Sequence, residues 1–172
     1  MCNATKPLLK DMRQLLTISL ILILFSCDTA TKTKNTTQTI DCNIALKFIN
    51  DYVKISEPST TSINHDDWVM QHGLLTDSFK SRYKFVIDSG WKAEPEVGLD
   101  FDPIFDGNSF PKGFEMVNCD NENGYVTVKG VDWPDFVLVL KLIKQDNITL
   151  IDGSGIINVP VDKRAKKKKK IT

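Results

Sequence analysis

Histidine is scarce in this chain: only His65 and His72 occur among its 172 residues. Neither lies at the spacing from a cysteine or another histidine that zinc sites use. The chain also lacks a glycine-rich phosphate loop, and its Gly-Ser-Gly stretch at 153–155 lies among strand and turn residues rather than at a strand-to-helix bend. We therefore expect no metal and no cofactor, because hydrolase and nucleotide-binding sites would lack essential parts.

The sequence also lacks an apolar run long enough to span a bilayer. Its longest such stretch, 15–25, has eleven residues, whereas a transmembrane helix needs about 20. Arg13 precedes this stretch, and Leu24-Phe25-Ser26-Cys27 ends it in a pattern that resembles the bacterial lipoprotein box. We expect 1–26 to be a lipoprotein signal peptide, with Met12 as an alternative start, and Cys27 to carry the lipid. The alternatives are an ordinary secretory signal and a membrane-spanning anchor.

Net charge is absent too, because 22 basic residues balance 22 acidic ones, but the two signs are segregated along the chain. Residues 28–162 carry 12 basic and 21 acidic side chains, whereas 163–172 carry seven basic ones and none that is acidic. An acidic body repels phosphates, so we expect no nucleic-acid partner. We expect 161–172 to be a basic, disordered tail that either binds anionic lipid head groups or remains solvated.

Few cysteines remain if Cys27 is acylated and Cys2 is removed with the signal. Residues 27–40, with six threonines after position 28, have no apolar period and are expected to form a flexible tether behind Cys27. Cys42 and Cys119 are then left in an oxidising compartment, where a disulfide between them is chemically permitted. Two separate buried thiols are the alternative.

Apolar periodicity predicts one domain over 41–160, with helices first and strands later. The expected helices cover 41–55, a short segment around 66–70, and a segment that Thr76 caps and Gly90 ends. The expected strands are 114–117, 125–128, 136–143 and 148–151, with 136–140 apolar on both faces and therefore central. This order predicts an α+β fold in which the N-terminal helices pack on an antiparallel sheet of about four strands.

Three segments carry a resemblance to a known family: "LLTDSFKSRYKFVID", "DPIFDGNSFP" and "VLVLKLIKQDNITLIDGSGI". Over roughly 43–158 they resemble an uncharacterised family of bacterial envelope lipoproteins with a nuclear-transport-factor-2-like, cystatin-like α+β cone domain. The resemblance implies a curved sheet and a cavity between sheet and helices. In other cone proteins that cavity holds a small ligand, an enzyme site or nothing.

Candidate site residues are concentrated in and around the loop 91–111. Asp102 and Asp106 lie there, with Tyr83 on the preceding helix and Trp91 upstream, and Trp133 lies between two strands. A carboxylate beside a tyrosine in an apolar pocket can act as a general base. The competing interpretation is that the aspartates make turn hydrogen bonds and that the tryptophans only pack. A calcium loop that includes Asp100 is disfavoured, because the spacing misses the EF-hand pattern.

Two hypotheses about function follow. The favoured one is a non-catalytic, lipid-anchored protein of the bacterial cell envelope, facing the periplasm or the cell surface. Its cone-like domain would bind a small molecule or an envelope protein through Tyr83, Trp91, Asp102, Asp106 and Trp133. The alternative is an isomerase- or dehydratase-like enzyme that uses Asp102 or Asp106 as base, with Tyr83 as its partner.

Overall fold

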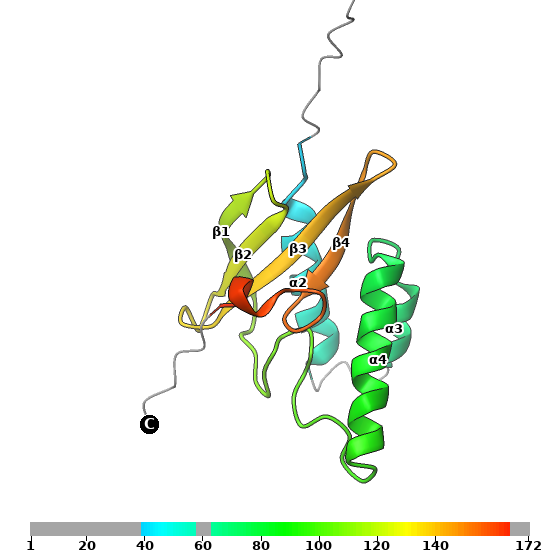
Figure 1. Ribbon diagram of the computed structural model, residues 1–172. Helices are drawn as coiled ribbons and strands as arrows, with labels where there is room; N and C mark the ends of the chain where they lie inside the picture. Colours follow the sequence, from blue (N-terminus) through cyan, green and yellow to red (C-terminus); the bar gives the residue numbers. More distant parts are fainter. Residues whose placement is uncertain (1–38, 58–62, 166–172) are drawn as a thin grey trace, which may run out of the picture. The chain divides into compact units, whose positions relative to one another are not determined.

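The computed structural model describes residues 39–57 and 63–165 (Figure 1). The expected signal peptide, the lipidation site Cys27 and most of the expected tether lie outside the described residues, as does the lysine run that begins at 166. No helix within the described part of the chain is both long enough and apolar enough to cross a membrane.

Within the described residues, three helices precede the sheet, as the periodicity predicted. They are α2 (Asn43–Ser56), α3 (His65–Gln71) and α4 (Asp77–Ala93). Side-chain caps start two of them: Asn64 accepts a hydrogen bond from the backbone N–H of Asp67, and Thr76 accepts one from that of Phe79. Such caps satisfy backbone donors that have no partner inside a helix.

The third helix does not end at Gly90, contrary to expectation, but continues to Ala93. Gly90 is buried, and a Cβ there would lie 2.5 Å from Cγ of Leu99. This glycine therefore allows the chain after the helix to cross close to the helix surface, rather than ending the helix. A glycine inside a helix costs about 1 kcal/mol relative to alanine.

The four expected strands form one open antiparallel sheet in the order β1-β2-β3-β4. They are β1 (Phe114–Asp120), β2 (Tyr125–Gly130), β3 (Val137–Gln145) and β4 (Ile148–Ser154). The α+β prediction is thus confirmed, and each strand is longer than expected. As predicted, the two-sided apolar strand β3 lies inside the sheet, between β2 and β4.

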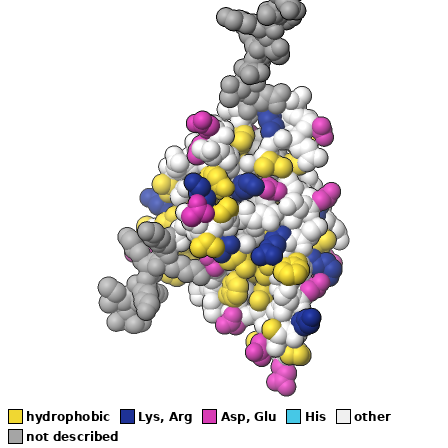
Figure 2. All heavy atoms as spheres, viewed as in Figure 1, with side chains coloured by type: hydrophobic (Ala, Val, Ile, Leu, Met, Phe, Trp, Pro, Cys, Tyr) yellow, Lys and Arg dark blue, Asp and Glu magenta, His cyan; other side chains and the backbone are white. Residues whose placement is uncertain are grey.

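The core lies between one face of the sheet and the helices. Leu138, Leu140 and Leu142 of β3 point into it, where Phe48 and Ile49 of α2 are almost fully buried. In Figure 1, α2 crosses behind the strands, while α4 lies beside β4 with α3 outside it. On the face of the molecule seen in Figure 2, acidic and basic side chains are interspersed.

Both edges of the sheet carry a protective feature. Along β4, the chain before α4 pairs in parallel, with Thr76 N–H donating to Ile151 O at 3.0 Å and Ile151 N–H donating to Leu74 O at 2.9 Å. Along β1, the Asn50 side chain bonds both backbone polar groups of Phe114. The register of β1 also shifts between Met116 and Asn118, which makes Val117 the extra residue of a bulge.

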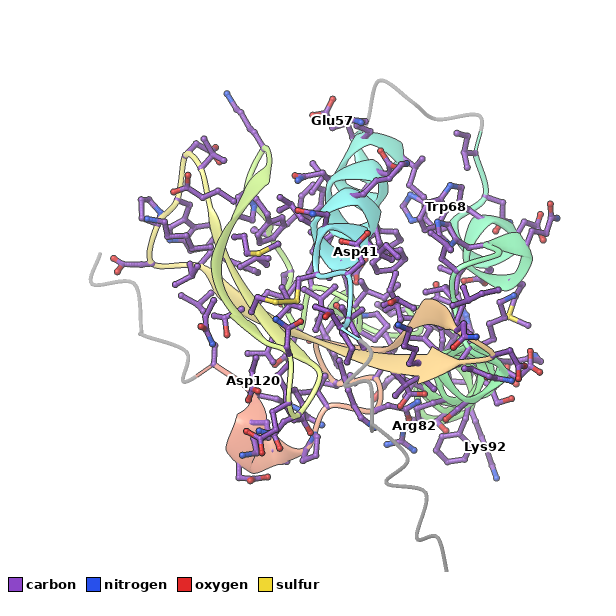
Figure 3. The ribbon with its side chains drawn as sticks, turned by 90° about the horizontal axis from the view of Figure 1, so that it is seen from above. Asp41, Glu57, Trp68, Arg82, Lys92 and Asp120 are labelled. Carbon is purple, nitrogen blue, oxygen red and sulfur yellow. A yellow bond between two sulfur atoms is a disulfide. The ribbon has the colours of Figure 1, made fainter. Side chains whose placement is uncertain are left out.

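A disulfide joins Cys42 and Cys119, which confirms the predicted pair. It connects the residue before α2 to the end of β1, across 77 residues of sequence (Figure 3). Because α2 packs on the sheet, this bond links the helical layer to the sheet at one end of the domain.

The C-terminal segment belongs to the domain further than expected. The expected tail began at 161, yet Val161–Lys163 forms the short 3-10 helix η2. Arg164 then donates from Nε to the carbonyl of Val159 at 2.8 Å, and the Lys163 ammonium lies 5.9 Å from the Tyr125 ring centroid. The segment therefore packs near β2, and the ordered chain extends past the boundary expected at 160.

Candidate functional site

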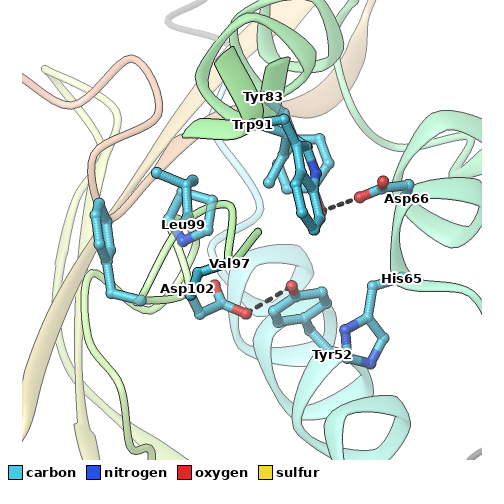
Figure 4. A pocket seen from close by; sticks show the side chains of 11 residues that line it. Tyr52, His65, Asp66, Tyr83, Trp91, Val97, Leu99 and Asp102 are labelled. Atoms are coloured by element: carbon cyan, nitrogen blue, oxygen red, sulfur yellow. Dashed lines mark hydrogen bonds between the residues drawn. The ribbon is translucent and has the colours of Figure 1, made fainter. Parts of the chain in front are cut away.

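A pocket of about 240 Å³ lies among the three helices and the loop that follows α4 (Figure 4). Its described lining residues come from helices and loops, not from strands. The cavity thus differs in place from the one the cone resemblance implied, which would lie between sheet and helices. The lining consists of Tyr52, His65, Asp66, Tyr83, Ile87, Trp91, Val97, Leu99, Phe101, Asp102 and Pro103.

One wall of the pocket is a stripe along α4. Tyr83, Ile87 and Trp91 are spaced four residues apart, so their side chains lie on one face of the helix. The loop opposite contributes Val97 and Leu99. Trp91 and Val97 are 52% and 64% exposed, so these two side chains form a rim that opens to solvent.

The polar part of the pocket consists of two tyrosine–carboxylate pairs. The Tyr83 hydroxyl donates to Asp66 Oδ1 at 2.7 Å, and the Tyr52 hydroxyl donates to Asp102 Oδ2 at 2.8 Å. Figure 4 shows both pairs facing the same space from opposite sides. Each pair joins two elements: α4 to α3, and α2 to the loop.

Asp102 is held by its own turn as well. Its Oδ1 accepts backbone hydrogen bonds from Ile104 at 2.7 Å and Phe105 at 3.0 Å. The backbone of Asp102 also pairs with that of Gly107 across a tight turn, in which Asp106 has a positive φ of 54°. The turn-forming role that competed with a catalytic role for Asp102 is therefore present in the structure.

Burial governs proton binding at this site. It raises the pKa of Asp102, and the hydrogen bonds from Phe105, Tyr52 and Ile104 oppose this only in part. Burial also raises the pKa of Tyr52, with the charge of Asp102 adding to the effect, and that of Tyr83, with its hydrogen bond to Asp66 adding to the effect. Both phenols thus keep their protons at neutral pH and act as donors to the carboxylates.

His65 completes the polar lining. Its Nε2 lies 3.0 Å from the carbonyl oxygen of Ile55. A carbonyl only accepts, so Nε2 carries a hydrogen and donates it to this oxygen. The second histidine, His72, lies outside the pocket, and its ring centroid is 4.6 Å from that of Trp68.

The structure brings together three of the five residues expected to bind a ligand. Tyr83, Trp91 and Asp102 line the pocket. Asp106 lies in the turn beyond Asp102, and Trp133 packs edge-to-face on Phe136 at 5.1 Å, and neither lines the pocket. Asp102 bonds Tyr52 rather than Tyr83, the partner expected for it, because Tyr83 bonds an aspartate of α3 instead.

Sequence reasoning missed Tyr52, His65 and Asp66 as pocket residues. Tyr52 belongs to the buried, apolar face of α2, and Asp66 lies in the acidic first turn of α3, so both have an ordinary structural explanation. The sequence could have indicated the site only through a tyrosine on each of two predicted helices, each able to bond an aspartate from another segment. Which acid serves which tyrosine depends on the tertiary packing.

Comparison with protein-family models, with curated proteins and with solved structures gives no match to this chain. Within residues 39–57 and 63–165, no three histidine, cysteine, aspartate or glutamate side chains lie close enough to hold a metal ion.

Proposed function

We propose that this protein is a non-catalytic, lipid-anchored protein of the bacterial cell envelope whose α+β domain binds a small ligand. The observation that carries the proposal is the pocket of about 240 Å³, which combines an apolar wall with two tyrosine–carboxylate pairs. Ligand sites typically combine apolar walls with a few well-placed polar groups. A small molecule fits this description better than the envelope-protein partner that the sequence also allowed.

The arrangement of Asp102 favours binding over catalysis. A general base needs a lone pair within reach of the proton that it removes. Both oxygens of Asp102 already accept hydrogen bonds from this chain, from two backbone N–H groups and from the Tyr52 hydroxyl. The carboxylate is thus engaged in holding its own loop.

The alternative is an isomerase- or dehydratase-like enzyme with Asp102 as base. One observation favours it: burial raises the pKa of Asp102, as enzymes do for carboxylates that exchange protons near neutral pH. In this alternative Tyr52, rather than Tyr83, is the neighbouring hydrogen-bond donor. Asp106 is not a candidate base, because it does not line the pocket.

The location in the envelope is supported by the sequence around Cys27 and by the resemblance to envelope lipoproteins. The disulfide between Cys42 and Cys119 agrees with it, because disulfides persist in oxidising compartments and are rare in the cytosol. Anionic lipid head groups are the proposed contacts of the lysine run at 166–170.

Native mass spectrometry of the full chain, solubilised from its own membranes, tests both halves of the proposal. We expect an added diacylglyceryl mass on the chain that begins at Cys27, and a small molecule that dissociates on collisional activation. The variant Cys27→Ser should lose the lipid mass and keep the ligand. A wild-type chain with neither addition would contradict the proposal. In a separate activity assay, turnover by the wild type that is lost in Asp102→Asn would support the enzyme alternative instead.

A further inference from the structure

The tyrosine, histidine and aspartate side chains that line the pocket present mainly acceptors, because their hydroxyl and ring hydrogens are used within the protein; the indole N–H of Trp91, on the exposed rim, is a donor. The hydroxyl hydrogen of Tyr52 is donated to Asp102, and that of Tyr83 is donated to Asp66. His65 uses its Nε2 hydrogen on the carbonyl of Ile55. Phenol oxygens and carboxylate oxygens accept hydrogen bonds. A ligand that satisfies these atoms must itself donate.

The charge of the pocket points the same way. Asp66 and Asp102 lie on two sides of it, while the described lining residues include no lysine and no arginine. Asp102 uses both oxygens within the protein, but Asp66 is exposed, and no hydrogen bond to its Oδ2 is seen among the described residues. Asp66 Oδ2 is therefore the acceptor best placed for a charged donor.

The remaining walls suit the body of such a ligand. Tyr83 and Trp91 bring aromatic rings to the pocket, and aromatic faces attract cations. Ile87, Val97 and Leu99 provide apolar surface beside them. Because the volume is only about 240 Å³, below the usual range of roughly 300–1,000 Å³ for ligand pockets, the occupant is small.

We propose that the pocket selects a small primary amine, whose ammonium group donates to Asp66 while its apolar body packs against Trp91 and Leu99. This inference rests on the proposed ligand-binding function and specifies the ligand class. It distinguishes the occupant from an alcohol, which lacks the charge, and from a carboxylate, which would face two carboxylates of the same sign.

Three probes with one ring system test the inference: benzylamine, benzyl alcohol and benzoate, each titrated calorimetrically into the detergent-solubilised full chain at neutral pH. We expect benzylamine to bind at least tenfold more tightly than benzyl alcohol, and benzoate not to bind. Added salt should weaken the binding of benzylamine and leave that of benzyl alcohol nearly unchanged. Butylamine, butanol and butyrate repeat the comparison without the ring.

A matched pair of variants locates the ammonium contact. Asp66→Asn removes the charge but keeps an oxygen for the Tyr83 hydroxyl, so the fold is retained and the affinity for benzylamine should fall at least tenfold. Asp67→Asn makes the same change at the neighbouring exposed residue, which does not line the pocket, and should alter the affinity less than twofold. Circular dichroism of both variants checks that they fold.

The outcomes separate the two proposals. Equal or tighter binding of the alcohols or carboxylates, or equal losses in the two variants, would overturn the amine inference and leave a ligand-binding pocket in place. If none of the six probes binds at millimolar concentration, the amine inference fails, whereas the proposed binding function is decided separately by the small molecule sought in native mass spectrometry.

Discussion

Asp102 serves two parts of the molecule at once. Its Oδ1 holds the turn that begins the loop 102–107, and its Oδ2 holds the Tyr52 hydroxyl of α2. Such a carboxylate must lose most of its hydration, which raises its pKa. The folded state therefore binds a proton at Asp102 more readily than the unfolded chain does.

This coupling predicts a pH dependence of stability. Because the folded pKa of Asp102 is above the unfolded one, its contribution to the free energy of unfolding is complete below the ordinary aspartate pKa and is lost as pH rises through the folded pKa. The amide that replaces the carboxylate in Asp102→Asn cannot ionise, yet its oxygen still accepts the two backbone bonds. At pH 7 the variant should lie within about 1 kcal/mol of wild type, or be more stable.

Urea unfolding between pH 4 and pH 7 measures this effect as the difference in stability between variant and wild type. The difference should shift in favour of Asp102→Asn as pH rises. Asp100→Asn, a change at an exposed neighbour outside the pocket, is the matched control for the loss of one carboxylate from this loop. If the free energies of unfolding of Asp102→Asn and wild type change in parallel with pH, Asp102 has the same pKa in the folded and unfolded states, and the prediction is wrong.

At the level of the elements, the turn after β4 supports the loop that forms the pocket. Gly155 has a positive φ of 56°, and a Cβ there would lie 2.5 Å from the carbonyl oxygens of Pro103 and Ile104. The hydroxyl of Ser154 also donates to the Ile104 carbonyl at 3.0 Å. The backbone of the turn that follows Asp102 therefore lies directly against the end of β4.

We predict that Gly155→Ala destabilises the protein by at least about 2 kcal/mol, because it combines a left-handed backbone with a steric overlap. Gly73→Ala is the matched control, since nothing lies within 4 Å of its added Cβ. Thermal unfolding of the two variants should show a clear loss in melting temperature only for the first. Equal melting temperatures would show that the 102–105 loop adjusts freely.

The elements themselves were predictable from local patterns, since apolar periodicity, caps and turn residues act within a few residues. Strand ends were less so: β3 continues through Lys144 and Gln145, polar residues that bond across to β4. Gly90 was misread because its role depends on Leu99, which approaches only in the folded chain. The same reason explains why the sequence predicted only part of the pocket. Tyr83 and Trp91 could be named from the sequence, but tertiary packing determines which aspartate each tyrosine bonds.

At the scale of the whole domain, the Cys42–Cys119 bond is the main covalent constraint. It closes a loop of 77 residues that contains all three helices and β1 almost to its end. Such a link restricts the unfolded chain far more than the folded one.

We expect reduction to lower the free energy of unfolding by about 4.5 kcal/mol, the chain-entropy value for a loop of 77 residues. The double variant Cys42→Ser/Cys119→Ser should show the same loss without reductant and no further change with it. Urea unfolding with and without dithiothreitol makes the measurement. A loss below about 1 kcal/mol would indicate that the reduced chain keeps the two ends of this loop close by other means.

The pairing of 74–76 along β4 has a further consequence. Identical molecules join into fibrils at edge strands with unpaired backbone groups, because such a strand can pair with a strand of the next molecule. Here one border already holds a segment of its own chain, and the other is bent by a bulge at Val117. Addition of a strand from another molecule at the β4 edge would require Leu74 and Thr76 to detach from Ile151. We therefore expect the native domain to remain free of cross-β fibres at high protein concentration.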